Sequence, residues 1–110
     1  MKKLSEKRCI PCEGEALPLT AVAAKKLLTE LSGWEFVEKN TAISKEYIFK
    51  NFDKAMDFVN LVADRAEQEN HHPDIHIYYN KVVLTLSTHA IGGLSENDFI
   101  LAAGIDSIRL

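Results

Sequence analysis

The amino-acid sequence predicts an α+β domain, in which a four-stranded antiparallel sheet carries three helices packed on one face. Apolar residues recur at helical spacing in two separate segments, and capping residues predict a third helix near the C-terminal end. Between successive helical segments lie two short stretches rich in strand-forming residues, joined by residues that favour tight turns. Each pair of stretches should form an antiparallel hairpin, so the expected order of elements is α-β-β-α-β-β-α.

The first half of the chain should contribute one helix and one hairpin. Thr20 can cap a helix that runs to about Leu31. Residues 34–38 begin with alternating aromatic and acidic side chains, which is typical of a half-buried strand. Residues 43–49 are rich in β-branched and aromatic side chains and should return through a turn at Asn40-Thr41.

The second half should continue with a helix and another hairpin. Asp53 is a good cap for a helix over residues 54–69, whose apolar stripe recurs at every third and fourth position. Residues 75–79 and 82–88 are the predicted strands. Asn80-Lys81 is the predicted two-residue turn between them, because Asn tolerates the left-handed conformation.

The last helix should begin after Ser95, with Asp98 as the capping-box acid, and end at about Ile108. A four-stranded sheet leaves two open edges and one face to cover, which favours self-association. We therefore expect a homodimer or a homotetramer.

Composition and charge exclude several classes of function. The length of 110 residues suits one domain, which we place at residues 19–110 after a flexible N-terminal arm of residues 1–18. The net charge of -3 and the scattered basic residues give no footprint for direct nucleic-acid binding. No apolar stretch is long enough to span a membrane, and the start leads into no apolar signal region. We expect a cytoplasmic protein with no membrane partner.

Cys9 and Cys12 form a CxxC motif in the N-terminal arm. Such a motif can be a redox pair, half of a zinc site or two unreactive thiols. Because the chain has no second CxxC and no βαβ pattern around this one, we interpret the two residues as unreactive thiols.

All four histidines lie between His71 and His89. Imidazole both donates and accepts protons near neutral pH, so several imidazoles beside a carboxylate suggest proton transfer or metal binding. The predicted turn places His72 opposite His89, with Cβ atoms about 5 Å apart. Glu67 lies one turn before His71, so its carboxylate could reach that imidazole if the helical geometry continues.

Three interpretations of the histidines remain open on the residues alone. The first is general acid/base catalysis, which we favour. In the second, three histidines and Glu67 hold a zinc ion, although adjacent histidines rarely point the same way and no HExxH spacing is present. In the third, the histidines are ordinary polar residues at the end of a strand.

A longer pattern joins these residues to others, Glu67-x3-His71-His72-Pro73-x5-Tyr79-x9-His89-x8-Asp98. It resembles the signature of the pterin-4a-carbinolamine dehydratases, also called 4a-hydroxytetrahydrobiopterin dehydratases. The segments YNKV (79–82), LSTH (86–89) and GLSE (93–96) and the Gly33-Trp34 pair are similar to that family too. The resemblance covers about residues 15–108.

The resemblance implies a lyase without metal or cofactor. Its substrate would be 4a-hydroxytetrahydrobiopterin, dehydrated to quinonoid dihydropterin and water in tetrahydrobiopterin recycling. The resemblance implies that His71 and His89 are the acid/base pair and that His72 binds and orients the pterin. It also implies that Glu67 orients and charges His71. The residues implied in substrate binding are Trp34, Pro73, Asp74, Ser87, Thr88 and Asp98.

Several of these positions also have a structural interpretation. Trp34 at the start of a strand is more often part of a core. Tyr79 shares its parity with the apolar strand residues, which favours packing, and Asp98 is explained as an acid in the first turn of a helix. The hydroxyls of Ser87 and Thr88 could bond to the pterin or to the backbone. His76 lies outside the pattern and is interpreted as a solvent-facing strand residue.

Two other functions stay open. The resemblance allows a protein-binding, dimerisation or assembly module on the same fold without pterin turnover, because the vertebrate form also acts as a dimerisation cofactor of a homeodomain transcription factor. A metal-dependent hydrolase built on the histidines is the remaining possibility.

Overall fold

The computed structural model describes residue 4 and residues 18–109. The secondary structure follows the predicted order, with a short 3₁₀ helix before the last α-helix. In chain order the elements are α1 (Ala21–Leu28), β1 (Glu35–Val37), β2 (Ala42–Ile48), α2 (Phe52–Glu69), β3 (Asp74–Tyr78), β4 (Lys81–Leu86), η2 (His89–Ile91) and α3 (Glu96–Asp106). Most of the expected N-terminal arm, including Cys9 and Cys12, lies outside the described residues.

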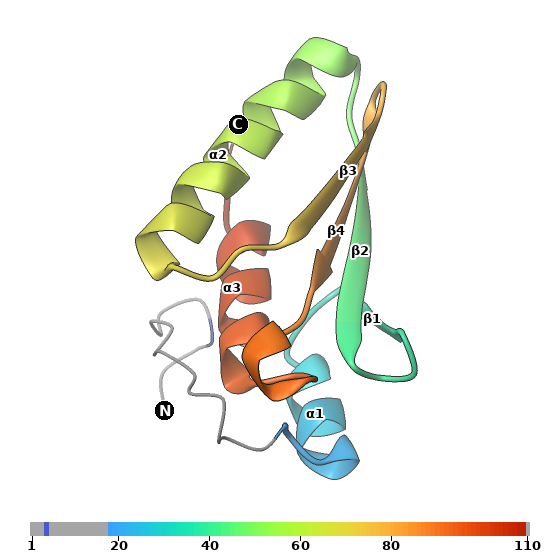
Figure 1. Cartoon of the computed structure of the whole chain (residues 1–110). Helices are drawn as coiled ribbons and strands as arrows, with labels where there is room; N and C mark the ends of the chain where they lie inside the picture. The colour runs from blue at the N-terminus through green and yellow to red at the C-terminus, as the bar shows by residue number, and fades with distance from the viewer. Residues whose placement is uncertain (1–3, 5–17, 110) are drawn as a thin grey trace.

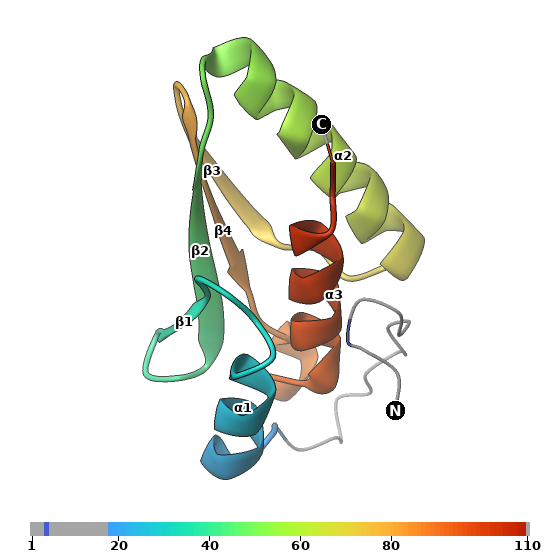
Figure 2. The same cartoon turned by 180° about the vertical axis from the view of Figure 1, so that it is seen from behind.

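The four strands form one antiparallel sheet in the order β1-β2-β4-β3, so that β2 and β4 are central and β1 and β3 are edges. Figures 1 and 2 show α2 and α3 covering one face of this sheet. The helix α1 packs against α3 at the end of the molecule away from the tip of the β3–β4 hairpin. The predicted α+β fold class is therefore confirmed. No helix in the described part of the chain is long and apolar enough to cross a membrane.

Alternation along β4 separates the core from the open face of the sheet. Val82, Leu84 and Leu86 are fully buried, whereas the residues between them are half-buried. Burying each such side chain contributes about 1.5–3 kcal/mol, so this row holds the sheet to the helices. The largest helical side chains of the same core are Phe58, Val62, Phe99, Leu101 and Ile105, and Leu4 joins it from the N-terminal segment.

The helix α2 begins earlier than predicted and ends where expected. The side chain of Asn51, not that of Asp53, accepts the backbone N–H of Lys54 at 3.0 Å. Asp53 instead lies in the first turn, where its negative charge favours the helix dipole. At the other end, Asn70 adopts the left-handed conformation with φ of 50° and stops the helix before Pro73.

The turn between β3 and β4 lies one residue earlier than predicted. Tyr78 pairs with Lys81, so the turn residues are Tyr79 and Asn80, and Tyr79 takes the left-handed conformation with φ of 54°. The cause lies outside the hairpin. Asn80 donates its side-chain amide to the Phe49 carbonyl at 3.0 Å, and the Asn80 carbonyl accepts the Phe49 N–H at 2.8 Å. These two bonds fix Asn80 beside the end of β2.

The earlier turn shifts the strand pairing by two residues. An even shift leaves every side chain on its predicted face, since the side-chain period of a strand is two. Asp74 now lies opposite Thr85 rather than Ser87. The predicted pairing of His72 with His89 is wrong, because both residues lie outside the paired strands.

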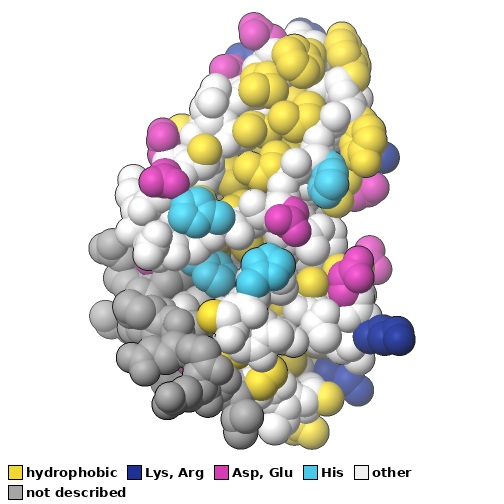
Figure 3. Space-filling view, in the orientation of Figure 1, with side chains coloured by type: hydrophobic (Ala, Val, Ile, Leu, Met, Phe, Trp, Pro, Cys, Tyr) yellow, Lys and Arg dark blue, Asp and Glu magenta, His cyan; other side chains and the backbone are white. Residues whose placement is uncertain are grey.

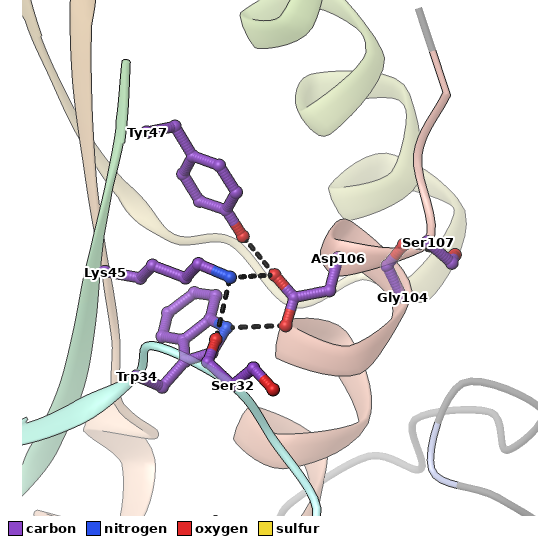
Figure 4. A network of polar contacts seen from close by, with 7 residues as sticks. All are labelled: Ser32, Trp34, Lys45, Tyr47, Gly104, Asp106 and Ser107. Carbon is purple, nitrogen blue, oxygen red and sulfur yellow. Dashed lines mark hydrogen bonds and ion pairs between the residues drawn. The ribbon is translucent and has the colours of Figure 1, made fainter.

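A polar network fastens the C-terminal end of α3 to the sheet (Figure 4). The carboxylate of Asp106 accepts hydrogen bonds from Trp34 Nε1 at 3.0 Å, from Lys45 Nζ at 2.9 Å and from the Tyr47 hydroxyl. Lys45 also donates to the carbonyl of Ser32 at 2.7 Å. One carboxylate thus connects α3, β2 and the segment that leads into β1.

The network should make the fold less stable at alkaline pH. Burial, together with the hydrogen bond to Asp106 and the charge of that carboxylate, raises the pKa of Tyr47 far above its ordinary value. The unfolded chain therefore loses this phenol proton first, at about pH 10, and unfolding becomes more favourable above that pH. Urea titrations between about pH 8 and 11 should show a steeper fall in the free energy of unfolding for the wild type than for Tyr47→Phe. Equal slopes would contradict this role of Tyr47.

Candidate active site

The histidine side chains gather on one face of the molecule (Figure 3). They come from the loop between α2 and β3, from β3 itself and from the start of η2; in that order they are His71, His72, His76 and His89. The site is therefore built where the C-terminal end of α2, one edge of the sheet and the segment before α3 meet (Figure 1).

The most buried imidazole of these is paired with a fully buried carboxylate. His71 Nε2 lies 2.6 Å from Asp98 Oδ1, and the two side chains are 13% and 0% exposed. An ionised carboxylate only accepts hydrogen bonds, so this contact places the ring proton on Nε2 and leaves Nδ1 of His71 able to accept a proton. A buried carboxylate at this position also stabilises the positive charge that the ring gains when it takes up a second proton.

Asp98 has a second role at the start of α3. Its Oδ2 accepts the backbone N–H of Ser95 at 2.9 Å, which forms the predicted capping box. The same oxygen accepts the hydroxyl of Thr88 at 2.8 Å. The structural interpretation of Asp98 is therefore confirmed, and the carboxylate contacts His71 in addition.

His89 lies at the start of a small closed loop. The backbone N–H of Thr88 donates to the Gly93 carbonyl at 2.9 Å, and the Thr88 carbonyl accepts the N–H of Ile91 at 3.1 Å. Gly92 takes the left-handed conformation with φ of 68°, which glycine adopts without strain. The loop exposes His89 to solvent, whereas the preceding residue, Thr88, is buried. Asp98 therefore contacts His71 through one carboxylate oxygen and Thr88, next to His89, through the other.

Glu67 binds the other histidine of the pair. Its Oε1 lies 2.7 Å from His72 Nε2, and the two side chains are 78% and 53% exposed. The predicted contact of Glu67 with His71 is therefore wrong. The left-handed residue Asn70 ends the helix before either histidine, so their side chains do not continue the helical spacing. An ion pair this exposed adds little stability, about 0–1 kcal/mol.

A hollow of about 430 Å³ lies beside His89 on the open face of the sheet. Asp74, His76 and Ser87 are among the side chains that line it. The remaining lining residues come from the β1–β2 turn, the start of β2, β4 and the η2 loop; they are Glu38, Thr41, Ala42, Thr85, Gly92 and Gly93.

His76 is exposed, as predicted. Its position in the lining of the hollow was not predicted from the sequence. The signal was present in the sequence: His76 shares the parity of Asp74, a predicted site residue, and so faces the same side of the sheet. The β1–β2 turn supplies another wall of the hollow through Thr41, and the η2 loop supplies a further wall through Gly92 and Gly93.

Two aromatic residues of the predicted pattern lie away from the histidines. Trp34 is 6% exposed within the core and donates to Asp106, so its structural interpretation is confirmed. Tyr79 is 67% exposed at the hairpin tip, where its ring stacks on Phe52 with centroids 6.5 Å apart. The prediction that Tyr79 packs on the apolar face is wrong, because the earlier turn takes it out of the strand.

Pro73 is half-buried in the loop between His72 and Asp74. Its fixed backbone angle suits the extended chain that enters β3. Within the described residues, no three histidine, cysteine, aspartate or glutamate side chains converge in the way that a metal site requires.

Comparison with known proteins identifies the family. The family model described as "Pterin 4 alpha carbinolamine dehydratase" matches residues 17–108. A relative from Nitrosospira multiformis, "Putative pterin-4-alpha-carbinolamine dehydratase", is 50% identical over 105 residues, which are 96% of this chain and 91% of the relative. These matches assign the chain to the dehydratases, which are hydro-lyases. It belongs to the pterin-4-alpha-carbinolamine dehydratase family, and the resemblance found in the sequence is confirmed.

One solved structure agrees with this assignment, and a second shares the fold. A "transcriptional coactivator/pterin dehydratase" from Brucella melitensis has a TM-score of 0.78 and 34% identity, with 82% of this chain and 96% of that chain covered. A "pterin dehydratase-like protein" described as a RuBisCO assembly factor in the alpha-carboxysome has a TM-score of 0.59 and 22% identity, with 68% and 87% covered. The second likeness shows the fold alone.

Proposed function

We propose that this chain dehydrates 4a-hydroxytetrahydrobiopterin to quinonoid dihydropterin and water, as a step of tetrahydrobiopterin recycling in the cytoplasm. The observation that carries the proposal is the contact of His71 with the buried Asp98, connected through Thr88 to the segment that presents His89. Membership of the dehydratase family supports the same reaction.

The reaction needs two proton transfers and no change of oxidation state. The bond between C4a and the hydroxyl oxygen breaks, the N5–H bond breaks, and a double bond forms between N5 and C4a. A proton must reach the departing hydroxyl, which leaves as water, and a base must take the proton from N5. Imidazoles can perform both transfers near neutral pH.

His71 suits the role of the base. Its Nε2 proton is held by Asp98, so Nδ1 is the nitrogen that accepts the N5 proton. His89, exposed at the start of η2, delivers a separate proton to the leaving hydroxyl. Asp98 stays ionised and stabilises the imidazolium that forms on His71.

The remaining residues would bind the pterin. We assign His72, whose exposed side chain is hydrogen-bonded to Glu67, to orienting the ring. Asp74 and Ser87 line the hollow beside His89 and offer an acceptor and a hydroxyl to the polar edge of a pterin. Pterin binding would then need no group other than these side chains and the backbone.

The direct test is stopped-flow decay of a 4a-hydroxytetrahydropterin with the purified chain, with and without a chelator. We expect acceleration over the enzyme-free decay that is unchanged by the chelator. Acceleration that the chelator abolishes would support a metal-dependent enzyme instead. No acceleration at all would refute the dehydratase proposal.

A second function, as a protein-binding or assembly module, is favoured by one observation. Exposed apolar side chains gather around the hairpin tip and the first turn of α2 (Figure 3). They include Ile48, Phe52, Tyr78 and Tyr79, which are 65%, 49%, 59% and 67% exposed. Exposed apolar patches of this kind mark protein–protein contacts. Turnover measured in the stopped-flow experiment separates this function from the first.

The same region should support self-association into a homodimer or a homotetramer. The edge strand β3 pairs with β4 on one side and presents Ile77 and Tyr78 partly to solvent. Replacing Ile77 with lysine should lower the mass measured by sedimentation equilibrium toward that of a single chain. Val22→Lys, which also replaces an exposed apolar side chain with lysine but lies on α1, is the matched control and should leave the mass unchanged. A wild-type chain that sediments as a monomer would contradict this expectation.

A further inference from the structure

Thr88 is the buried residue between the last strand and His89. Its side chain is 4% exposed in total, and its hydroxyl lies 2.8 Å from Asp98 Oδ2 and 2.7 Å from Ser95 Oγ. The hydroxyl is thus already engaged within the protein. Substrate binding, which the sequence pattern implied for Thr88, does not use this contact.

We propose that Thr88 is a positioning residue, whose hydroxyl orients the Asp98 carboxylate and through it the imidazole of His71. The inference rests on the proposed dehydration for its kinetic part. It adds a residue that acts on the base without touching the pterin.

The direction of each hydrogen bond follows from the atoms involved. The carboxylate of Asp98 accepts only, so the single hydroxyl proton of Thr88 points to Oδ2. Thr88 Oγ1 has then no proton left for Ser95, and Ser95 Oγ must donate to it. Protons are therefore ordered from Ser95 through Thr88 to Asp98, and His71 donates to the other carboxylate oxygen.

This order fixes the rotation of the carboxylate. Two donors, the Thr88 hydroxyl and the Ser95 N–H, hold Oδ2, so that Oδ1 is left to His71. Without the hydroxyl, one donor remains on Oδ2 and the helix cap survives. The carboxylate then turns more freely, and the tautomer and orientation of His71 are less well defined. Small displacements of a catalytic group are costly, about 100-fold in rate for 1 Å.

The kinetic test compares Thr88→Val, which keeps the shape and removes the hydroxyl, with Thr88→Ser, which keeps the hydroxyl. We expect Thr88→Val to lower kcat by about tenfold with KM changed less than about twofold, since the hydroxyl does not meet the substrate. Thr88→Ser should restore kcat to within about threefold of the wild type. Thr29→Val, which removes a hydroxyl bonded to the Lys26 carbonyl on the exposed side of α1, is the matched control and should leave both constants unchanged.

The spectroscopic test needs no pterin. Long-range ¹H–¹⁵N correlation spectra of the full chain, at a pH where the ring is neutral, should show His71 of the wild type protonated on Nε2 alone. Thr88→Val should show a mixture of the two tautomers, and Thr88→Ser should show the wild-type form.

The outcomes separate this inference from the proposed function. A wild-type His71 protonated on Nδ1 would overturn the inference even if Thr88→Val does not fold. Equal kcat losses in the valine and serine variants would also overturn it, because the hydroxyl that serine keeps would then not restore the rate. A wild type that does not accelerate pterin dehydration refutes the proposed function, while the tautomer spectra still decide the role of Thr88.

Discussion

Replacing His71 with alanine should lower kcat for pterin dehydration by about 100-fold, because a positioned acid or base contributes ~10²–10⁴-fold in rate. His89→Ala should cause a loss of similar size. The carboxylate of Asp98 cannot substitute for His71, since it is fully buried and held by the cap of α3. Measurement is by stopped-flow decay of the 4a-hydroxypterin, with KM determined separately for each variant.

The double variant tests whether the two imidazoles act in one step. If His71 removes the N5 proton while His89 protonates the leaving hydroxyl, loss of either stops the concerted transfer. The double variant should then be about as slow as the slower single variant, and far faster than the product of the two losses predicts. Added free imidazole should return part of the activity to each single variant. Unchanged rates in either single variant would refute its assignment.

Some features of the histidine site could be predicted from the sequence, and others depend on tertiary contacts. Strand parity placed Asp74 and His76 on the open face of the sheet correctly, because a period of two survives an even shift of register. The register itself depends on Asn80, which bonds to Phe49, the residue directly after β2 and distant in the sequence. A rule based on the turn residues alone contains no information about that contact. The predicted pairing of His72 with His89 was wrong because it depended on the position of the turn.

The backbone conformation of Asn70 determines which carboxylate each of the two adjacent histidines contacts. The sequence pattern contained both carboxylates, but assigned Glu67 to His71 because one helical turn separates them. Asn70 leaves the helix in the left-handed conformation, so His71 turns inward to Asp98 and His72 meets Glu67. The capping role of Asp98 was readable from its spacing to Ser95. Its contact with His71 required the packing of α3 beside the end of α2, which no local pattern shows.

The corrected partners also change how the site should respond to substitution. The contact of His71 with Asp98 is buried, so its geometry is maintained by the core around it. The contact of His72 with Glu67 is exposed, so water can replace either partner. Variants of Glu67 should therefore act mainly on pterin binding, and variants of Asp98 on both catalysis and folding.

Replacing Asp106 with alanine should lower the free energy of unfolding by about 2–4 kcal/mol. The change removes the shared acceptor of Trp34, Lys45 and Tyr47, which would lie in a largely buried space without it. Each buried donor left unpaired costs about 1–3 kcal/mol, and the 23% exposure of the Asp106 side chain lets water offset part of the sum.

Trp34, the single tryptophan of the chain, reports this loss directly, because its indole is one of the donors. Urea unfolding followed by Trp34 fluorescence should show a lower midpoint with an unchanged slope. Asp57→Ala is the matched control: its carboxylate meets only the exposed Lys54 at 3.8 Å among the described residues, so its effect should stay within about 0.5 kcal/mol. A loss below about 1 kcal/mol for Asp106→Ala would show that water replaces the carboxylate fully and that the network does not hold α3 to the sheet.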